Sequence, residues 1–246
     1  MRLNYIDNID CLEGMKAIPD GSVDMVLCDL PYGTTARNSW DSIIPMDRLW
    51  EQYHRIVKDD GAICLFAQLP FDKKLAMSNI RELRYEWVWV KPRGTGHLNA
   101  KKMPMKAHEV VLVFYKKSPT YNPQMRDGKP YTRNSGWGST NYREQTRGVT
   151  VNTGGRYPLD VLEFALNRGQ HPTQKPVALC EYLIKTYTTP GEVVLDNCMG
   201  SGTTAVACIN TGRNYIGFEL NEEYHAIAQQ RVADAEHEKA VAGRML

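Results

Sequence analysis

Two short segments of the 246-residue sequence carry residue types that could do chemistry. The first is Asp29-Leu30-Pro31-Tyr32, which follows an apolar run at residues 23–28 that predicts a buried strand. Ligands of open α/β sheets bind beyond the carboxyl ends of the strands, so these residues would lie beside a substrate. The Asp29 carboxylate and the Leu30 carbonyl could hold both N–H bonds of an exocyclic amine, and Tyr32 could stack on a planar base. Alone, the segment fits equally well a turn that ends a strand.

The second segment is a glycine-rich turn at residues 196–204 (Asp-Asn-Cys-Met-Gly-Ser-Gly-Thr-Thr), between a predicted strand and a predicted helix. Gly200 and Gly202 would let the backbone approach a ligand closely, because no Cβ stands in the way. Glu219 ends the next predicted strand, where its carboxylate could accept hydrogen bonds from two ribose hydroxyls. The spacing also fits a dinucleotide-binding turn. Because we expect only one more strand and one more helix after the helix that this turn opens, a single nucleoside-type ligand is favoured over a dinucleotide.

Together, the two segments resemble those of the DNA amino-methyltransferases, and the resemblance covers most of the chain. In that family the first segment has the pattern Asp/Asn/Ser-Pro-Pro-Tyr. Here Leu30 replaces the first Pro, although the role at this position belongs to the main-chain carbonyl. The family's cofactor turn begins Asp-Pro-Phe, whereas this chain has Asn197 and Cys198 after the Asp. A third match is the segment His-Pro-Thr-Gln-Lys-Pro at residues 171–176.

The resemblance implies an S-adenosylmethionine-dependent enzyme that methylates N6 of an adenine flipped out of double-stranded DNA, by direct attack of the amino group. It implies that residues 29–32 are catalytic, that Thr173 and Lys175 lie near the methionine carboxylate of the cofactor, and that Asp10 lies near its adenine amino group. The cofactor-binding residues are then Asp10, Thr173, Lys175, Asp196, Gly200, Ser201, Gly202, Thr203 and Glu219. The segments Trp89-Val90-Lys91 and His108-Glu109 match positions adjacent to the pocket in related enzymes, and we expect His108 at a strand start or in the core.

The order of the segments along the chain has a structural implication within this family. The catalytic segment comes first, a basic region follows and the cofactor turn comes last, which is the circularly permuted arrangement called the beta class. The resemblance therefore implies a Rossmann-like α/β fold with a mostly parallel seven-stranded sheet and helices on both faces. The C-terminal strand pair would lie beside the N-terminal strands.

Hydrophobic periodicity by itself predicts alternating strands and helices, the pattern of an α/β domain. Strands are predicted at residues 23–28, 61–67, 85–90, 109–115, 193–197 and 215–219, and helices at 46–58, 71–83, 175–187, 203–211 and from 221 onward. Residues 118–170 show little periodicity and predict a long, functional loop. We therefore expect a catalytic half at 1–117, a basic target-recognition insert at 118–170 and a cofactor-binding half at 171–246.

The charge distribution points to a polyanionic partner, which we expect to be double-stranded DNA. The net charge is +2, yet residues 91–156 contain 13 Lys and Arg residues against three Asp and Glu residues. Aromatic residues among the arginines of the insert could stack on bases while the cations hold phosphates. The predicted DNA-binding residues are Arg126, Lys129, Arg133, Arg143 and Arg147. A solvated basic loop is the competing interpretation.

The remaining features limit the alternatives. The six cysteines are scattered, with no Cys-x-x-Cys pair, so we expect reduced thiols, no metal site and a cytoplasmic protein without a membrane span. No Pro-Cys dipeptide occurs, which disfavours methylation at cytosine C5. Cytosine N4 is the nearest rival, followed by a catalytically inactive DNA-binding protein and a nicotinamide oxidoreductase. A homodimer, a partner restriction enzyme and the recognition sequence stay open.

Overall fold

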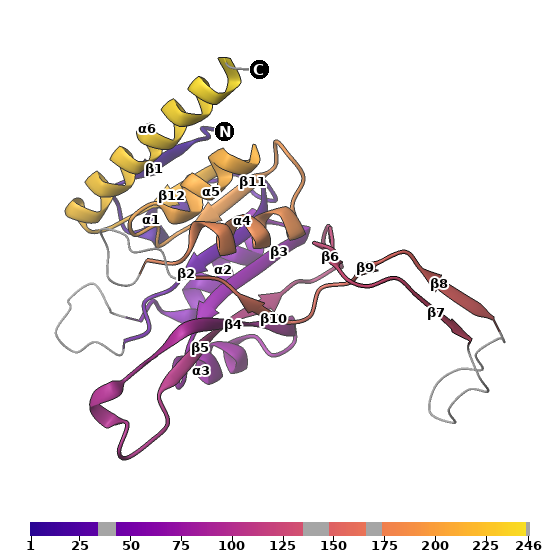
Figure 1. Ribbon diagram of the computed structural model, residues 1–246. Coiled ribbons are helices and arrows are strands. Elements are labelled where there is room, and N and C mark those ends of the chain that lie inside the picture. Colours follow the sequence, from indigo (N-terminus) through magenta and orange to yellow (C-terminus); the bar gives the residue numbers. More distant parts are fainter. Residues whose placement is uncertain (34–42, 135–147, 166–173, 245–246) are drawn as a thin grey trace. The chain divides into compact units, whose positions relative to one another are not determined.

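One mixed sheet of eight strands organises most of the chain (Figure 1). The computed structural model describes residues 1–33, 43–134, 148–165 and 174–244. In order across the sheet, the strands are β1 (Tyr5–Asp7), β12 (Asn214–Phe218), β11 (Val193–Asp196), β2 (Val23–Asp29), β3 (Val57–Ala67), β5 (Lys106–Phe114), β4 (Leu83–Thr95) and β10 (Val161–Glu163). All neighbours are parallel except the pairs that β5 makes with β3 and β4. The strands β11 and β12 lie between β1 and β2, so the predicted placement of the C-terminal strand pair is confirmed.

The prediction of seven strands is wrong, because the sheet has eight. Two of the eight, β1 and β10, lie outside the six ranges that periodicity predicts, and β10 comes from the segment that the sequence predicts to be a loop. It pairs in parallel with the edge strand β4, from Val161 opposite Val88 to Glu163 opposite Val90. A strand of three residues is too short to show a period of two, so hydrophobic periodicity does not reveal it.

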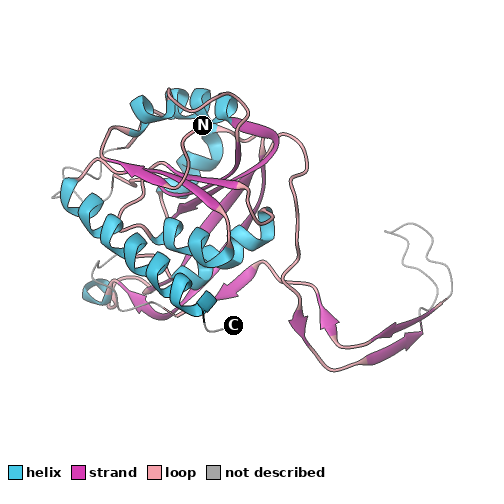
Figure 2. Cartoon of the chain, turned by 90° about the horizontal axis from the view of Figure 1, so that it is seen from above, coloured by secondary structure: helices cyan, strands magenta, loops and turns pink. Residues whose placement is uncertain are grey.

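Helices cover both faces of the sheet (Figure 2). They are α1 (Cys11–Met15), α2 (Met46–Ile56) and α3 (Phe71–Ser78) on one face, and α4 (Val177–Tyr187), α5 (Thr203–Thr211) and α6 (Glu222–Arg244) on the other. Successive side chains of β2 point to opposite faces. Met25 and Leu27 therefore pack in the cluster with α4–α6, whereas Val26 and Cys28 pack in the cluster with α1–α3.

Two helices end earlier than their periodicity predicts. The helix predicted at 46–58 ends at Ile56, because Val57 is extended and begins β3. The helix predicted at 71–83 ends at Ser78, because Asn79 leaves helical geometry and its carbonyl accepts hydrogen bonds from the next turn.

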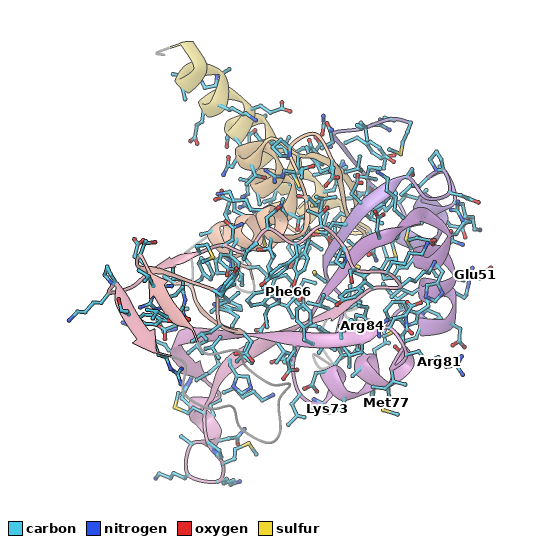
Figure 3. All side chains as sticks on the ribbon, turned by 90° about the vertical axis from the view of Figure 1, so that its right-hand side faces the viewer. Glu51, Phe66, Lys73, Met77, Arg81 and Arg84 are labelled. Carbon is cyan, nitrogen blue, oxygen red and sulfur yellow. The ribbon has the colours of Figure 1, made fainter. Side chains whose placement is uncertain are left out.

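In Figure 3 Phe66 lies in the interior, whereas Met77 of α3 lies on the outside.

A second, small unit comprises Pro123–Leu159. It contains two antiparallel ladders: β6 (Arg126–Asp127) pairs with β9 (Gly155–Arg156), and β7 (Tyr131–Asn134) pairs with β8 (Val149–Asn152). The sequence predicts a loop here. The strands have two to four residues each, so they depend on cross-strand pairing rather than on a repeating apolar pattern.

Two further expectations concern the cysteines and membrane-spanning helices. All six cysteines are free, and five of them are buried, as predicted for reduced thiols. Among the described residues, no helix combines the length and the apolar character that crossing a bilayer requires.

Candidate functional site

The two segments that could do chemistry leave the sheet at the same edge. Strands β2 and β11 are parallel neighbours, with Met25 opposite Val194 and Val26 opposite Leu195. The chain therefore emerges after Asp29 and after Asp196 on one side of the sheet, at adjacent strand ends. This is the position where open α/β sheets bind ligands.

The Asp29 carboxylate is held by two side chains. The Tyr32 hydroxyl donates to Asp29 Oδ1 over 2.7 Å, and the Lys175 ammonium donates to Asp29 Oδ2. The Tyr32 ring stacks on Phe71 with the centroids 5.2 Å apart. Burial, with the Asp29 and Glu109 carboxylates nearby, raises the pKa of Tyr32 well above its usual value, so its hydroxyl stays protonated and donates. The Leu30 side chain is buried in the core beside α1–α3, which explains how an apolar residue replaces the family's proline.

Lys175 also belongs to a buried row of alternating charges. Its Nζ lies 3.3 Å from Glu109 Oε2, and Glu109 Oε1 accepts a hydrogen bond from Lys91. Burial opposes the charges, but the two carboxylates raise the pKa of Lys175, and Lys175 and Lys91 lower the pKa of Glu109. Lys175 is therefore a cation and Glu109 an anion at neutral pH. The row Lys91–Glu109–Lys175–Asp29 connects β4 and β5 to the end of β2.

Sequence reasoning foresaw only part of this charge row. The resemblance implies Lys175 near the methionine carboxylate of a cofactor, and in the structure Lys175 pairs with Asp29 and Glu109. Lys91 and Glu109 stood out only as neighbours of the pocket. His108, expected at a strand start or in the core, lies near the start of β5 and is exposed.

Both glycines of this turn have left-handed backbone conformations, which favour glycine. Gly202 has φ +83°, and a Cβ there would lie 3.0 Å from the Cα of Ala228 in α6. Gly200 has φ +55°, and a Cβ there would meet, among described atoms, the Cys198 carbonyl oxygen at 4.0 Å. The backbone at Gly200 is thus open to close approach by a ligand, as the sequence predicts. The same prediction is wrong for Gly202, because α6 fills the space beside it.

The Asp196 carboxylate braces this turn from inside. Its Oδ2 accepts from the Thr204 hydroxyl over 2.6 Å and its Oδ1 from the Cys198 N–H over 3.1 Å. Burial raises the pKa of Asp196 to about 6. With 4% of its surface exposed, Asp196 shapes the turn more than it presents a group to a ligand.

Glu219 stands beside the turn at the end of β12. One carboxylate oxygen accepts from the Gly200 N–H over 2.7 Å and the other from the Asn221 N–H over 2.8 Å. Asn8 fixes the same backbone by donating to the carbonyls of Glu219 and Leu220. A carboxylate has about four acceptor sites, so Glu219 can still accept the two ribose hydroxyls that the sequence assigns to it.

Two residues that sequence reasoning missed support the turn from other elements. Arg231 of α6 donates to the carbonyl and the hydroxyl of Ser201, at 2.5 and 3.0 Å, and to the hydroxyl of Thr203 at 3.3 Å. Tyr53 of α2 donates to the Asn197 side chain over 2.5 Å, which gives a partner to the residue that replaces the family's proline. No local pattern marks either residue, because both contacts join distant parts of the chain.

The other two implied cofactor residues have different outcomes. Asp10 is exposed and caps α1, accepting from the N–H groups of Leu12 at 2.9 Å and Glu13 at 3.2 Å. Both contacts use Asp10 Oδ1, so Asp10 caps the helix, and its role toward the cofactor adenine stays a prediction. Thr173 lies outside the described residues.

The predicted DNA-binding residues fall in the small unit. Arg126, Lys129 and Arg133 are exposed there, and Arg143 and Arg147 lie outside the described residues. Arg156 instead stabilises the unit itself. It donates to the carbonyl of Lys129, and its guanidinium lies 4.7 Å from the centre of the Tyr131 ring.

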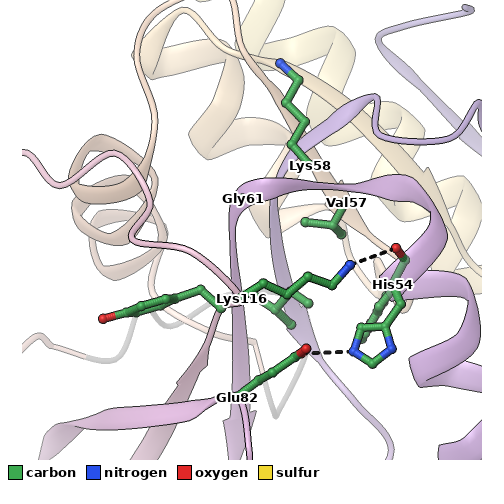
Figure 4. A pocket seen from close by; sticks show the side chains of 9 residues that line it. His54, Val57, Lys58, Gly61, Glu82 and Lys116 are labelled. Atoms are coloured by element: carbon green, nitrogen blue, oxygen red, sulfur yellow. Dashed lines mark hydrogen bonds and ion pairs between the residues drawn. The ribbon is translucent and has the colours of Figure 1, made fainter.

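A pocket at the opposite edge of the sheet does not belong to this site (Figure 4). It lies at the amino ends of β3 and β4, where His54 Nε2 is 2.9 Å from Glu82 Oε2 and Lys116 donates to the His54 carbonyl over 3.1 Å. These contacts join α2 to the sheet. In the part of the chain that the structure describes, no three His, Cys, Asp or Glu side chains are grouped to hold a metal ion.

The fold and the site define a DNA methylase. The family of N6 and N4 DNA methylases matches residues 23–230, so the chain belongs to it. Among curated relatives, the chain is 29% identical to the DNA adenine methyltransferase YhdJ of Escherichia coli (strain K12), over 94% of this chain and 83% of that protein. Among solved structures, the M1.HpyAVI complex with SAM is 26% identical, with a TM-score of 0.63 over 92% of this chain and 98% of that one. The cytosine-N4-specific PvuII DNA methyltransferase shares the fold, with a TM-score of 0.70 at 17% identity over 95% and 91% of the two chains.

Proposed function

We propose that this chain is an S-adenosylmethionine-dependent methyltransferase of the beta class that methylates N6 of adenine in double-stranded DNA. The observation that carries the proposal is the position of Asp29 and the glycine turn at one edge of the sheet, on neighbouring parallel strands. A methyl donor held at the turn would then face an amino group held at Asp29. YhdJ and M1.HpyAVI, by their names, support adenine and this cofactor respectively.

The cofactor would supply a methyl group bound to a sulfonium. Gly200 leaves room for the cofactor against the backbone, Gly202 allows the turn to pack against α6, and Glu219 can accept the ribose hydroxyls of the cofactor. Each oxygen of Asp29 already accepts one hydrogen bond, from Tyr32 and from Lys175, and each can accept another. Asp29 can therefore take one N–H of the target amine without displacing either partner.

The chain's own residues then orient the amine for transfer. Asp29 and the Leu30 carbonyl would hold its two N–H bonds, so that the nitrogen lone pair points toward the methyl group. As the new N–C bond forms, the bond between the methyl group and the sulfonium sulfur would break and leave a neutral thioether. The nitrogen must also lose one proton, and Asp29 is the adjacent acceptor. Lys175 is a cation with a raised pKa, so it orients Asp29 and does not take the proton.

Adenine is favoured over cytosine N4 because cytosine-N4 enzymes of this family more often begin the catalytic segment with Ser, whereas this segment begins with Asp29 and is followed by Gly33. The amine geometry would be the same for both bases, so the base has to be read directly. The gene is expressed in a host without DNA methylation, and the modified bases are mapped by long-read sequencing. N6-methyladenine at a defined sequence supports the proposal. N4-methylcytosine would show that the target base is cytosine, and unmodified DNA would refute methyl transfer.

Asp29→Ala tests the catalytic assignment. We expect methyl transfer to be lost and S-adenosylmethionine binding, measured by calorimetry, to be retained. Asp60→Ala, which removes an exposed carboxylate near the amino end of β3, is the matched control and should transfer normally. Near-normal turnover of Asp29→Ala would contradict the assigned role. A thermal shift with S-adenosylmethionine and none with NAD would exclude the oxidoreductase alternative.

We further propose that the unit Pro123–Leu159 contains the target-recognition region and that Arg126, Lys129 and Arg133 bind DNA phosphates. Their exposure and positive charge support this assignment. Reversing all three charges should weaken DNA binding and lower the dependence of affinity on salt, by about 0.9 in slope for each phosphate that is no longer neutralised. An unchanged salt slope would exclude these residues from the interface.

A further inference from the structure

Strands β4 and β5 continue past the sheet as an arm, which we define as residues 91–106. The regular pairing of β4 with β5 is interrupted after Val90 opposite His108 and resumes at Thr95 opposite Lys106. Figure 1 shows this arm extending beyond the sheet, with a short 3-10 helix, η1 (His97–Asn99), near its tip. Both strands of the arm belong to the same compact unit as the candidate active site.

The arm leaves the edge that carries Asp29. Strand β4 is antiparallel to β5, and β5 is antiparallel to β3, so β4 runs in the same direction as β3 and β2. The carboxyl end of β4 therefore lies at the carboxyl edge of the sheet. Lys91 at the base of the arm bonds Glu109, which pairs with Lys175, which holds Asp29. Two residues, Glu109 and Lys175, thus link the base of the arm to the catalytic carboxylate.

The tip of the arm is built from hydrogen-bonded turns. Gly96 has φ +88° and starts η1, and its carbonyl accepts from the Asn99 N–H over 2.9 Å. The Asn99 carbonyl in turn accepts from the N–H groups of Lys102 and Met103, at 2.8 and 3.0 Å. These hydrogen bonds, with that from the Ala100 N–H to the His97 carbonyl, connect successive turns of the tip.

This ordered tip presents apolar side chains to solvent within a cationic surface. Leu98 in the middle of η1 is 88% exposed, and Met103 and Met105 are 56% and 43% exposed. The arm carries five Lys and Arg residues, and no acidic residue occurs from Lys91 to His108. Folding explains neither feature, since the exposed leucine contributes nothing to the core. The combination fits a partner with an anionic surface and an apolar interior.

We propose that the arm binds double-stranded DNA at the target site and that Leu98 enters the base stack in place of the flipped base. This inference rests on the proposed function. A flipped base leaves a gap in the stack, and apolar side chains inserted between base steps are a known means of stabilising such distortion. The five residues 91–95 carry the tip roughly 15 Å from the base of the arm at about 3.3 Å each, enough to enter a groove. Lys101 and Lys102, beside the tip, bind the phosphates.

The insertion of Leu98 into the base stack is tested with Leu98→Ala on two DNA substrates that contain the mapped recognition site. One is an intact duplex; in the other the target base faces an abasic site and is already unpaired. We expect kcat/KM to fall about 10- to 100-fold on the intact duplex, because unstacking costs a few kcal/mol, and to stay near that of the unchanged protein on the abasic duplex. Met77→Ala, another exposed apolar side chain, is the matched control and should match the unchanged protein on both. Insertion of Leu98 is refuted if Leu98→Ala and Met77→Ala are equally active on the intact duplex. It is also refuted if Leu98→Ala loses the same activity on both substrates.

Phosphate binding by the arm is tested without methyl transfer, by anisotropy of a fluorescent duplex of random sequence at several salt concentrations. Lys101→Glu with Lys102→Glu should lower the slope of log affinity against log salt by about 2, since each phosphate that is no longer neutralised removes about 0.9. The adjacent pair Lys116→Glu with Lys117→Glu, at the opposite edge of the sheet, is the matched control and should leave the slope unchanged. Equal slopes for the two double variants refute the arm as a DNA-binding element. Because this readout needs no catalysis, it separates failure of the arm from failure of the proposed enzymatic function.

Discussion

The Glu109→Gln substitution tests whether the buried charge row holds the active-site edge together. Glu109, Lys91 and Lys175 have side chains that are 10%, 11% and 9% exposed. Glutamine keeps the shape of the side chain but removes its negative charge, which leaves the Lys91 ammonium buried without a carboxylate partner. Lys175 remains paired with Asp29. Breaking a buried pair in this way costs about 3 kcal/mol. For a chain of this size, that lowers Tm by about 6 to 12 °C.

The assay is urea denaturation followed by circular dichroism, with Glu86→Gln on the exposed side of β4 as the control. The control should change the free energy of unfolding by less than about 0.5 kcal/mol. Adding Lys91→Met to Glu109→Gln removes the unpaired cation and should recover about 1 to 2 kcal/mol. A loss below about 0.5 kcal/mol for Glu109→Gln, or a double variant weaker than the single one, would refute the reasoning.

The charge row also predicts how this difference depends on pH. The pKa of Glu109 is lowered in the folded protein, from an ordinary value of 4.5, by Lys175 and Lys91 acting against burial. A lowered pKa contributes stability above the ordinary value, and that contribution is lost as the pH falls through the folded value. The difference in the free energy of unfolding between the wild-type protein and Glu109→Gln should therefore be largest above pH 4.5 and decrease below it.

Three further substitutions test the cofactor turn. Gly202→Ala places a Cβ 3.0 Å from the Cα of Ala228 at φ +83°, so we expect the free energy of unfolding to fall by about 1 to 3 kcal/mol. Binding of S-adenosylmethionine, measured by calorimetry, should be lost as well, and unchanged binding would contradict the role of the turn. Burial raises the pKa of Asp196 to about 6 from 3.8, so stability should fall by about 3 kcal/mol as the pH rises through that window, and Asp196→Asn should flatten the fall in urea titrations; an equally steep fall would exclude Asp196 as its source. Tyr53→Phe leaves Asn197 without its donor and should cost about 1 to 2 kcal/mol in urea unfolding, whereas no cost would mean that this hydrogen bond does not brace the turn.

Some features of this protein follow from short stretches of sequence. The apolar run before Asp29 predicts a strand with a carboxylate at its end, and the structure has β2 ending there. The glycines at 200 and 202 predict a tight turn, and both have positive φ. The apolar face of the helix from Met46 includes Leu49 and Tyr53, both fully buried. Each of these depends on local backbone geometry and on the pattern of neighbouring residues, which the sequence contains.

Other features depend on contacts between distant residues. Glu109 meets Lys91 because the β4–β5 register places Glu109 opposite Trp89, two residues before Lys91 in an extended strand. Lys175 meets Asp29 across 146 positions of sequence. In both cases the residue types alone allow several partners, including the cofactor carboxylate that the family resemblance implies for Lys175.

The sequence by itself therefore determined which residues could bind, hold or polarise a ligand, because backbone permissiveness and side-chain chemistry are local properties. Only the tertiary structure decided which charges pair, that a three-residue strand extends the sheet, and that an arm with an exposed leucine starts at the catalytic edge. Those outcomes depend on strand register and strand order, which are set by packing across the whole sheet.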